Sequence, residues 1–227
     1  MPTPSAGRVP PTSKKTLTAW YPNVKMDEFT DLSADQSSDE NFAAADFLGA
    51  EEITITRTQT SLLFEHHYNV RITVNLRAGT GISEAVLRQA TVMLPAFNMN
   101  NYMPNSDGTI TIDAGSVSGP VYPHERTPAT AGYIRTFDAV VGAIVFEQDK
   151  TIELIRITID GNNDYSYQMI SRLGDLTFQD NRHYTYNVTV NDDGLTLASP
   201  TGGTWEQGVK DENIESEDAN STPSNNP

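Results

Sequence analysis

Strict alternation of apolar and polar residues is the feature that most limits the folds open to this chain. The clearest runs cover residues 70–76 and 184–190, where Val, Ile, Leu and Tyr alternate with Arg, Thr and Asn. Successive side chains of a β-strand point to opposite faces, so this period of two predicts half-buried strands. Residues 110–112 repeat the pattern, and residues 152–159 are rich in β-branched side chains. Residues 139–146 are almost continuously apolar, which predicts burial on both faces.

Turn residues separate these runs in the way that antiparallel strands require. Residues 191–194 read Asn-Asp-Asp-Gly between two apolar runs, and an Asp-Gly pair supplies the positive φ of a hairpin turn. A helix is expected only at residues 83–90, with Ser83 as its N-cap. The sequence therefore predicts an all-β fold, an antiparallel β-sandwich or barrel. The predicted core contains Val70, Ile72, Val74, Leu76, Ile144, Ile157, Tyr186 and Val188.

Charge and cysteine content exclude several classes of partner and of chemistry. The 227 residues include 30 acidic and 15 basic side chains, for a net charge of −15. Nucleic acids and anionic membranes attract positive surfaces, so neither is an expected partner. The absence of cysteine rules out disulfides, thiolate metal sites and a cysteine nucleophile. No apolar run approaches the ~18 residues of a membrane-spanning helix, and the first residues show no export signal.

The acidity is concentrated in two segments and leaves the rest of the chain nearly neutral. Residues 26–52 hold nine acidic side chains and no basic one, and residues 206–227 hold six against Lys210. Such runs usually keep a chain soluble. Residues 1–16 contain four prolines among Ser, Thr and Gly, which predicts a disordered leader. Residues 209–227 are expected to form a disordered acidic tail.

No sequence motif for catalysis or for phosphate binding is present. His66 and His67 are adjacent and face opposite ways on a strand, so they are not expected to share a metal ion. The oxygen-rich segments Asp160–Asp164 and Asn191–Asp193 lack the spacing of an EF-hand, and turn chemistry explains them, although calcium there stays open. We therefore expect no catalytic, cofactor-binding or metal-binding residues and no cofactor.

Two tryptophans lie near the ends of the region expected to fold. Trp20 follows the leader and Trp205 comes at the end of the predicted strands. Aromatic rings of this kind can bind sugars, but they more often fill the ends of a sandwich core. We expect both to be core residues.

Several segments, taken in order, resemble the fimbrillin-like proteins of Bacteroidetes, which are type V pilus subunits and related surface lipoproteins. The resemblance covers roughly residues 17–208, and its most specific part is the C-terminal strand with the Gly-Leu pair and the tryptophan that follow it. The segments are Ala19-Trp20-Tyr21-Pro22, Asp35-Gln36-Ser37-Ser38, Ala45-Asp46-Phe47-Leu48, Leu62-Leu63-Phe64-Glu65-His66-His67, Val70-Arg71-Ile72-Thr73-Val74, His183-Tyr184-Thr185-Tyr186-Asn187-Val188-Thr189-Val190, Gly194-Leu195 and Trp205-Glu206.

This resemblance implies two β-sandwich domains of transthyretin-like topology. Residues 17–50 correspond to the last strands of a first domain whose beginning is missing, and residues 51–208 to a complete C-terminal sandwich. It also implies export as an outer-membrane lipoprotein and removal of a first strand by an arginine-specific protease. The groove opened in this way takes up a strand from a neighbouring subunit. The lipidation cysteine and the processing arginine have no matching residues in this sequence.

The resulting expectation is a structural or adhesive subunit of cell-surface fimbriae that is not an enzyme. Its partners would be other pilus subunits, bound by strand addition, and host or bacterial surface ligands, with no small-molecule substrate. The alternative is a carbohydrate-binding surface module that uses Trp20 or exposed tyrosines. A hydrolase with two facing carboxylates is a third possibility, because the separation such a pair needs is spatial and the chain has 30 acidic residues.

Limited proteolysis tests the predicted ends of the chain. Residues 1–16 and 210–227 lack apolar anchors, so nothing offsets the entropy lost on ordering them. We expect protease to trim both ends and leave a stable fragment, which mass spectrometry would identify. A tail that resists protease in the monomer would show that the prediction is wrong.

Overall fold

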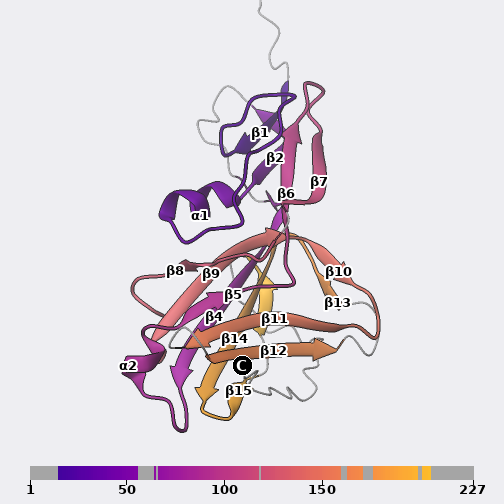
Figure 1. Cartoon of the computed structure of the whole chain (residues 1–227). Coiled ribbons are helices and arrows are strands. Elements are labelled where there is room, and N and C mark those ends of the chain that lie inside the picture. Colours follow the sequence, from indigo (N-terminus) through magenta and orange to yellow (C-terminus); the bar gives the residue numbers. More distant parts are fainter. Residues whose placement is uncertain are drawn as a thin grey trace, which may run out of the picture.

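The fold is all-β, as the alternation predicts. The computed structural model describes residues 15–55, 64, 66–117, 119–159, 163–170, 176–198 and 201–205. This part of the chain contains sixteen strands and two short helices (Figure 1). Neither helix has the length and apolar character needed to cross a membrane. A large sandwich forms the lower part of Figure 1, and a smaller β-structure lies above it.

The large sheet of the sandwich has β4 at its centre. Its strands follow the order β15, β14, β4, β9, β8, with β16 beside β14. Its members are β4 (Asn69–Ala78), β8 (His124–Glu125), β9 (Arg135–Gly142), β14 (Arg182–Asn191), β15 (Gly194–Leu197) and β16 (Thr201–Thr204). Neighbouring strands are antiparallel except β4 and β14, which run parallel over nine residue pairs. The alternation predicted both strands, but it carries no information on the direction of their pairing, so this parallel pair was not foreseen.

A second layer crosses the large sheet and closes the main core. It consists of β5 (Thr91–Met93), β11 (Thr151–Ile159) and β12 (Asn163–Ile170), with the pair β10 (Ile144–Phe146) and β13 (Leu176–Phe178) beside them. In Figure 1, β11 and β12 run across the front of β4 and β14. Of the eight predicted core residues, seven are buried, and Ile144 is partly buried against the same cluster. The expected hairpin joins β14 to β15, with Gly194 at a positive φ of 148°.

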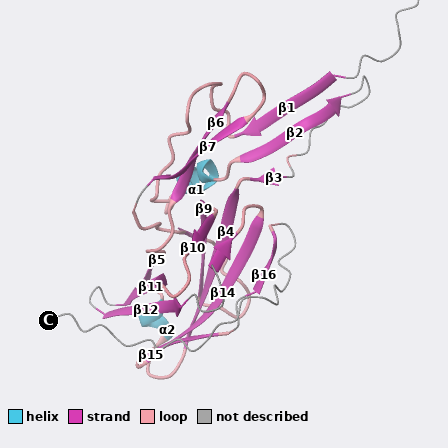
Figure 2. Ribbon diagram, turned by 90° about the vertical axis from the view of Figure 1, so that its right-hand side faces the viewer, coloured by secondary structure: helices cyan, strands magenta, loops and turns pink. Residues whose placement is uncertain are grey.

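The smaller β-structure, which we call the N-terminal lobe, combines the start of the chain with a hairpin from its middle. Its strands are β1 (Lys15–Tyr21), β2 (Leu48–Ile55), β3 (His66–His67), β6 (Met99–Pro104) and β7 (Ile110–Val117). Figure 2 shows β1 and β2 beside the β6–β7 hairpin. Phe47, Tyr68 and Tyr102 form a separate small core in this lobe, and Trp20 and Ile110 pack against it. Strand β2 continues through residues 50 and 51, where the sequence suggested a domain boundary.

One helix was predicted correctly and another was missed. Helix α2 (Glu84–Leu87) begins after Ser83, whose hydroxyl accepts from the Val86 amide, as expected of an N-cap. Helix α1 (Asp39–Ala45) was not expected, because its acidic sequence was interpreted as a solvated segment. Ser38 caps α1 in the same way as Ser83 caps α2. The acidic side chains in the first turn of α1 stabilise the helix, because they lie at the positive end of its dipole.

Burial departs from the prediction in three strands. The polar face of β4 was expected to meet solvent, yet Thr73 and Asn75 are buried. Strand β9 is buried on both faces as predicted, whereas Val145 in β10 is exposed. Strand β7 was expected to be half-buried, but most of it is exposed, including Ile112. Each difference arises from segments distant in sequence that cover, or leave uncovered, one face of a strand.

The outer edge of β9 is closed by separate pieces of chain. Its edge-facing residues are Thr136, Asp138, Val140 and Gly142, since alternate residues direct their backbone groups to the same side. The amide of Arg126 donates to the Thr136 carbonyl, β8 pairs with Asp138, and the Gly142 amide donates to the Asn98 carbonyl.

A side chain closes the remaining gap in this edge. The fully buried side chain of Gln36 donates from Nε2 to the Val140 carbonyl at 2.6 Å and accepts from the Val140 amide at 2.9 Å. The amide of Gln36 therefore takes the place of a neighbouring strand. This protects the edge against pairing with another chain and fixes residues 34–46 on the sandwich.

Replacing Gln36 should expose this dependence. Gln36→Ala leaves the Val140 amide and carbonyl without partners, and each unpaired buried group costs about 1–3 kcal/mol. We expect a lower free energy of unfolding in chemical denaturation and faster hydrogen exchange of the Val140 amide. Gln36→Glu keeps an acceptor but places a buried carboxylate against the Val140 carbonyl, so its effect should be at least as large as that of Gln36→Ala. Gln89→Ala, at an exposed position, is the control, and an equal effect of both alanine variants would contradict the account.

Candidate functional site

The two adjacent histidines bind different partners, as their opposite orientations predict. His66 Nε2 lies 3.2 Å from an Asp180 carboxylate oxygen, and His67 Nδ1 lies 2.9 Å from one of Asp46. The His67 ring also stacks on Trp205, with centroids 4.0 Å apart. Within the described ranges, no group of three or more His, Asp or Glu side chains is placed to hold a metal ion.

Side chains of both oxygen-rich segments have hydrogen-bond partners within the protein where they are described. Asn191 accepts from the Thr80 amide at 2.9 Å and donates to the Thr196 hydroxyl at 3.1 Å. Asp164 accepts from the Thr158 hydroxyl at 2.6 Å. Residues 160–162 of the other segment, where calcium was left as an alternative, lie outside the described residues.

Both tryptophans are partly buried and packed. Trp20 donates from Nε1 to the Val24 carbonyl at 3.1 Å and packs on the small core of the N-terminal lobe. Trp205 packs against the main core and stacks on His67. These contacts support the expectation that the tryptophans stabilise the fold. The exposed aromatic side chains in the described chain are Tyr21, Phe29 and Tyr122.

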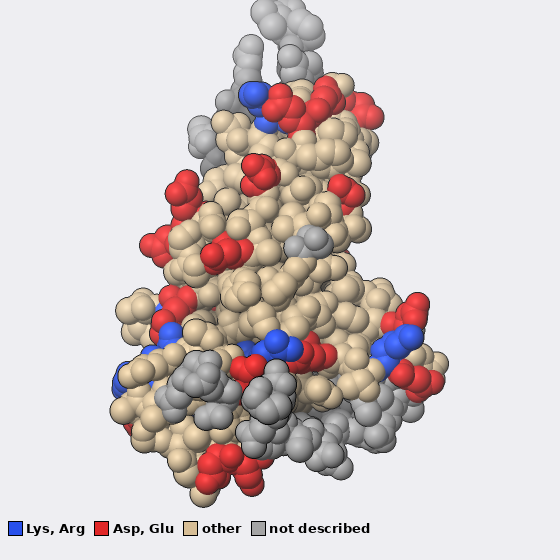
Figure 3. Space-filling model, in the orientation of Figure 1, with Lys and Arg blue, Asp and Glu red and all other residues tan. Residues whose placement is uncertain are grey.

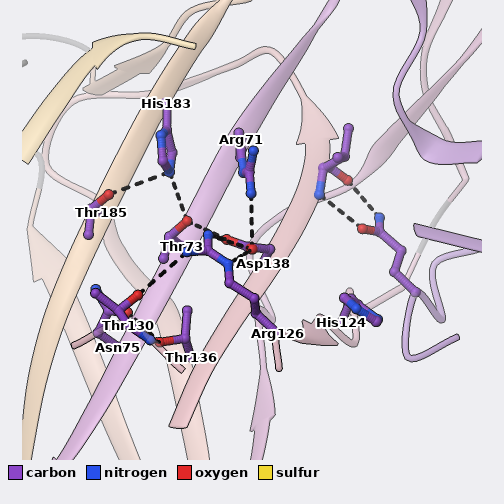
Figure 4. Close-up of polar contacts among 12 residues, drawn as sticks. Arg71, Thr73, Asn75, His124, Arg126, Thr130, Thr136, Asp138, His183 and Thr185 are labelled. Carbon is purple, nitrogen blue, oxygen red and sulfur yellow. Dashed lines mark hydrogen bonds and ion pairs between the residues drawn. The ribbon is translucent and has the colours of Figure 1, made fainter. Parts of the chain in front are cut away.

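A buried polar cluster lies on the face of the large sheet away from the main core (Figure 4). Its centre is Asp138 of β9, the one buried carboxylate among the residues described. Arg126 binds Asp138 through two nitrogens at 2.7 and 2.8 Å, and Arg71 of β4 adds a contact at 3.0 Å. Thr73 donates its hydroxyl hydrogen to Asp138 at 2.5 Å. The cluster therefore holds two guanidinium groups around one carboxylate.

His183 of β14 completes this cluster on the other side of β4. Its Nε2 lies 2.7 Å from the Thr73 hydroxyl, whose single hydrogen already goes to Asp138. The imidazole must therefore donate from Nε2, so the neutral tautomer with its proton on Nε2 is the one that fits. Burial, together with the charge of Arg71, lowers the pKa of His183 to about 4 from 6.5.

The loop between β8 and β9 covers the part of the same face around Asn75 and Thr136. This cover explains why these two polar side chains are buried. Thr136 donates to the Asn75 side chain at 2.7 Å and accepts from the Thr130 amide at 2.8 Å. Asn75 in turn donates to Asn187 of β14 at 2.9 Å. Arg126 and Thr130 thus tie the loop between β8 and β9 to the sheet. The sequence showed these residues as a polar face, but not the loop that covers them.

The cluster is suited to stabilising the fold rather than to catalysis. Burial alone would raise the pKa of Asp138, but the charge of Arg71, the hydrogen bond from Thr73 and the contacts of Arg126 hold it below its ordinary value. Asp138 is therefore an ionised carboxylate whose oxygens already accept from three side chains. A general base must be able to reach a substrate proton, and Asp138 is enclosed by its own partners.

Exposed apolar side chains mark the N-terminal lobe more strongly than the sandwich. Five of the seven large apolar residues exposed in the described chain belong to the first strand and the segment after it, or to β7. These five are Leu17, Tyr21, Met26, Phe29 and Ile112. The small core of this lobe contains only three buried hydrophobic residues. The large exposed apolar side chains of the described chain are therefore concentrated in this lobe.

Comparison with known proteins gives a family and a fold. A model of the fimbrillin-like family matches residues 10–205. A candidate cell adhesion protein from Bacteroides uniformis superposes with a TM-score of 0.60 and 18% identity, over 83% of this chain and 71% of its own. A second, from Bacteroides ovatus, gives 0.56 and 16%, over 84% and 67%. At these identities the likeness shows a shared fold. No curated protein matches the sequence.

The pKa of His183 predicts an acid-sensitive contribution to stability. The unfolded chain, with an ordinary histidine, takes up a proton as the pH falls below 6.5, while the folded protein does so only near pH 4. The free energy of unfolding should therefore decrease as the pH falls from 6.5 towards 4. Denaturant titrations at several pH values should show a smaller decrease for His183→Gln. Thr185→Val, which keeps the imidazole, is the control, and an unchanged pH dependence in His183→Gln would contradict the assignment.

Proposed function

The chain belongs to the fimbrillin-like family, and from this membership we propose that it is a structural or adhesive subunit of cell-surface fimbriae. In this proposal the protein acts at the cell surface, contacts other pilus subunits and performs no catalysis. Anchoring in the outer membrane as a lipoprotein is part of the same proposal. So is the division into residues 17–50, as the remnant of a first domain, and residues 51–208, as a sandwich.

The exposed apolar surface of the N-terminal lobe carries this proposal. A subunit must bind its neighbours through surface that an isolated copy leaves uncovered, and five of the seven large exposed apolar residues of the described chain belong to this lobe. Strand addition is the mode of contact that fits such a lobe. Main-chain hydrogen bonds then supply affinity, and pockets for alternate side chains supply specificity.

The polar cluster supports the non-catalytic part of the proposal. Asp138, Thr73 and His183 satisfy one another and bind Arg71 and Arg126. Their contacts connect β4, β9, β14 and the loop after β8, as expected of a cluster that stiffens the sheet. Such stiffness suits a subunit that has to keep its shape within a polymer.

Binding assays distinguish this function from carbohydrate recognition. We expect the full-length protein to associate with itself or a related subunit in cross-linking and size-exclusion chromatography. We expect no tight binding on a glycan array and no hydrolysis of glycosides or peptides. Tight glycan binding that Trp20→Ala removes without loss of the fold would overturn the proposal.

The tryptophan variants provide the matching stability measurement. Complete burial of an aromatic side chain makes its replacement by alanine cost about 3–5 kcal/mol. Trp20 and Trp205 are partly buried. We therefore expect Trp20→Ala and Trp205→Ala each to lower the free energy of unfolding by somewhat less than this range, and so to lower the melting temperature. Tyr122→Ala, at an exposed aromatic residue, should have little effect.

A further inference from the structure

The last described strand has little besides its backbone to hold it in place. Strand β16 reads Thr-Gly-Gly-Thr and pairs only with β14 among the residues described. Glycine has no side chain to pack and loses more conformational freedom on folding than other residues, so it weakens the interior of a strand. Trp205 follows β16 directly and packs against the main core. We therefore expect Trp205 to anchor β16.

Strand β3 of the N-terminal lobe is also weak by itself. It consists of His66 and His67 and pairs only with β2 in the described part of the chain. After it, the Tyr68 amide continues the pairing by donating to the Phe47 carbonyl at 3.0 Å. So short a strand forms too few backbone hydrogen bonds to hold its own position. Its order therefore depends on the side chains packed around it.

These two weak strands meet through one aromatic pair. The rings of His67 and Trp205 are stacked, with centroids 4.0 Å apart and an angle of 9° between their planes. Asp46 holds the imidazole in this orientation, because its two carboxylate oxygens lie 2.9 and 3.1 Å from Nδ1 of His67. In Figure 2, β3 lies above β16 on the same side of the molecule. The stack thus connects the C-terminal strand to the N-terminal lobe.

Asn181 connects the same two strands through hydrogen bonds. Its carbonyl accepts from the Trp205 amide at 3.2 Å, and its side-chain oxygen accepts from the His67 amide at 3.4 Å. Its own amide donates to the carbonyl of Asn69, the first residue of β4, at 3.0 Å. The φ of 56° at Asn181 lies in the left-handed region, which asparagine adopts more readily than most residues. Displacing either strand therefore breaks a bond to a residue that also holds the other.

Ion pairs contribute little to the join between the lobe and the sandwich. The basic side chains coloured in Figure 3 lie at the top of the N-terminal lobe and on the sandwich, and among the residues described none is visible between them. His66 Nε2 lies 3.2 Å from Asp180, but the two side chains are 44% and 49% exposed, so solvent screens this contact. The side chain of His67 is only 12% exposed. Its stack on Trp205 is therefore the better shielded contact of β3.

We propose that His67 and Trp205 form a latch through which β3 and β16 open and close as one unit, so that each strand stays ordered only while the other is in place. This inference goes beyond the proposed function and does not depend on it. Opening of such short segments needs less free energy than global unfolding. Coupling between two elements is reciprocal, so a molecule that holds one strand closed also stabilises the other. The N-terminal lobe thereby responds to the state of the C-terminal strand.

Hydrogen exchange of single amides, followed by NMR on the full-length protein, tests the latch. Trp205→Leu keeps an apolar side chain against the core but removes the ring. Loss of one aromatic pair changes a local opening equilibrium by about fivefold, so we expect the Tyr68 amide to exchange faster by about this factor. His67→Ala should accelerate exchange of the Trp205 amide to a similar extent. Trp205→Phe keeps a ring for the stack and should leave exchange of the Tyr68 amide close to that of the wild type.

A matched variant and a reference amide separate the latch from general stability. Phe146 of β10 is also a partly buried aromatic residue packed against the main core, and its ring contacts other phenylalanines. Phe146→Leu therefore makes the same kind of change away from the latch, and it should leave exchange of the Tyr68 amide unchanged. The Val140 amide lies within the large sheet and reports on the stability of the whole fold in each variant.

Three results would overturn the inference. Faster exchange in β16 but not at Tyr68 in Trp205→Leu would mean that the two strands open separately. Equal acceleration at Tyr68 and Val140 would mean that Trp205 supports only the core as a whole. If Trp205→Leu does not fold, His67→Ala decides, and an unchanged Trp205 amide in that variant would contradict the latch. These results concern the single subunit, so the proposed function is tested separately by association.

Discussion

The need to satisfy backbone hydrogen-bonding groups at sheet margins determines how this molecule is assembled. The centre of the large sheet satisfies its own groups through the ladders of β4, β9 and β14. Its β9 margin depends on three other segments, of which the one around Gln36 acts through a side chain. Because Gln36 is held in the sheet, the chain around it is fixed, and α1 can pack against β9 and lead into the N-terminal lobe. A buried amide thus links the two parts of the molecule.

The sequence was sufficient for elements whose pattern is local. Alternation located β4 and β14, and the Ser83 cap located α2. It was insufficient where a second segment decides the outcome. The parallel pairing of β4 with β14 joins residues about 110 positions apart. Burial of Thr73 depends on a loop that begins more than 50 residues later. Helix α1 has a recognisable Ser38 cap, but its acidic first turn resembles a solvated loop.

Neither the residue patterns nor the resemblance predicted the polar cluster of the large sheet as a site. Sequence reasoning expected that His66 and His67 would not share a metal ion, and the structure places the two rings against different carboxylates. It missed the cluster around Asp138, because two arginines and one aspartate on three different elements give no local signal. It also missed the packing of β6 and β7 on the first strands, which brings Trp20 and Ile110 to one small core. Asp138 is enclosed by its own partners, whereas most of the large exposed apolar side chains of the described chain lie in the N-terminal lobe.

Hydrogen–deuterium exchange of the full-length protein at increasing concentration tests the proposed function most directly, in which copies meet through the N-terminal lobe. The account predicts that backbone amides of β1 and of residues 110–113 in β7 become protected as the concentration rises. The Val140 amide, already bonded to Gln36, should be equally protected at every concentration. Protection that appears at the margins of the large sheet instead, with β1 and β7 unchanged, would contradict the account.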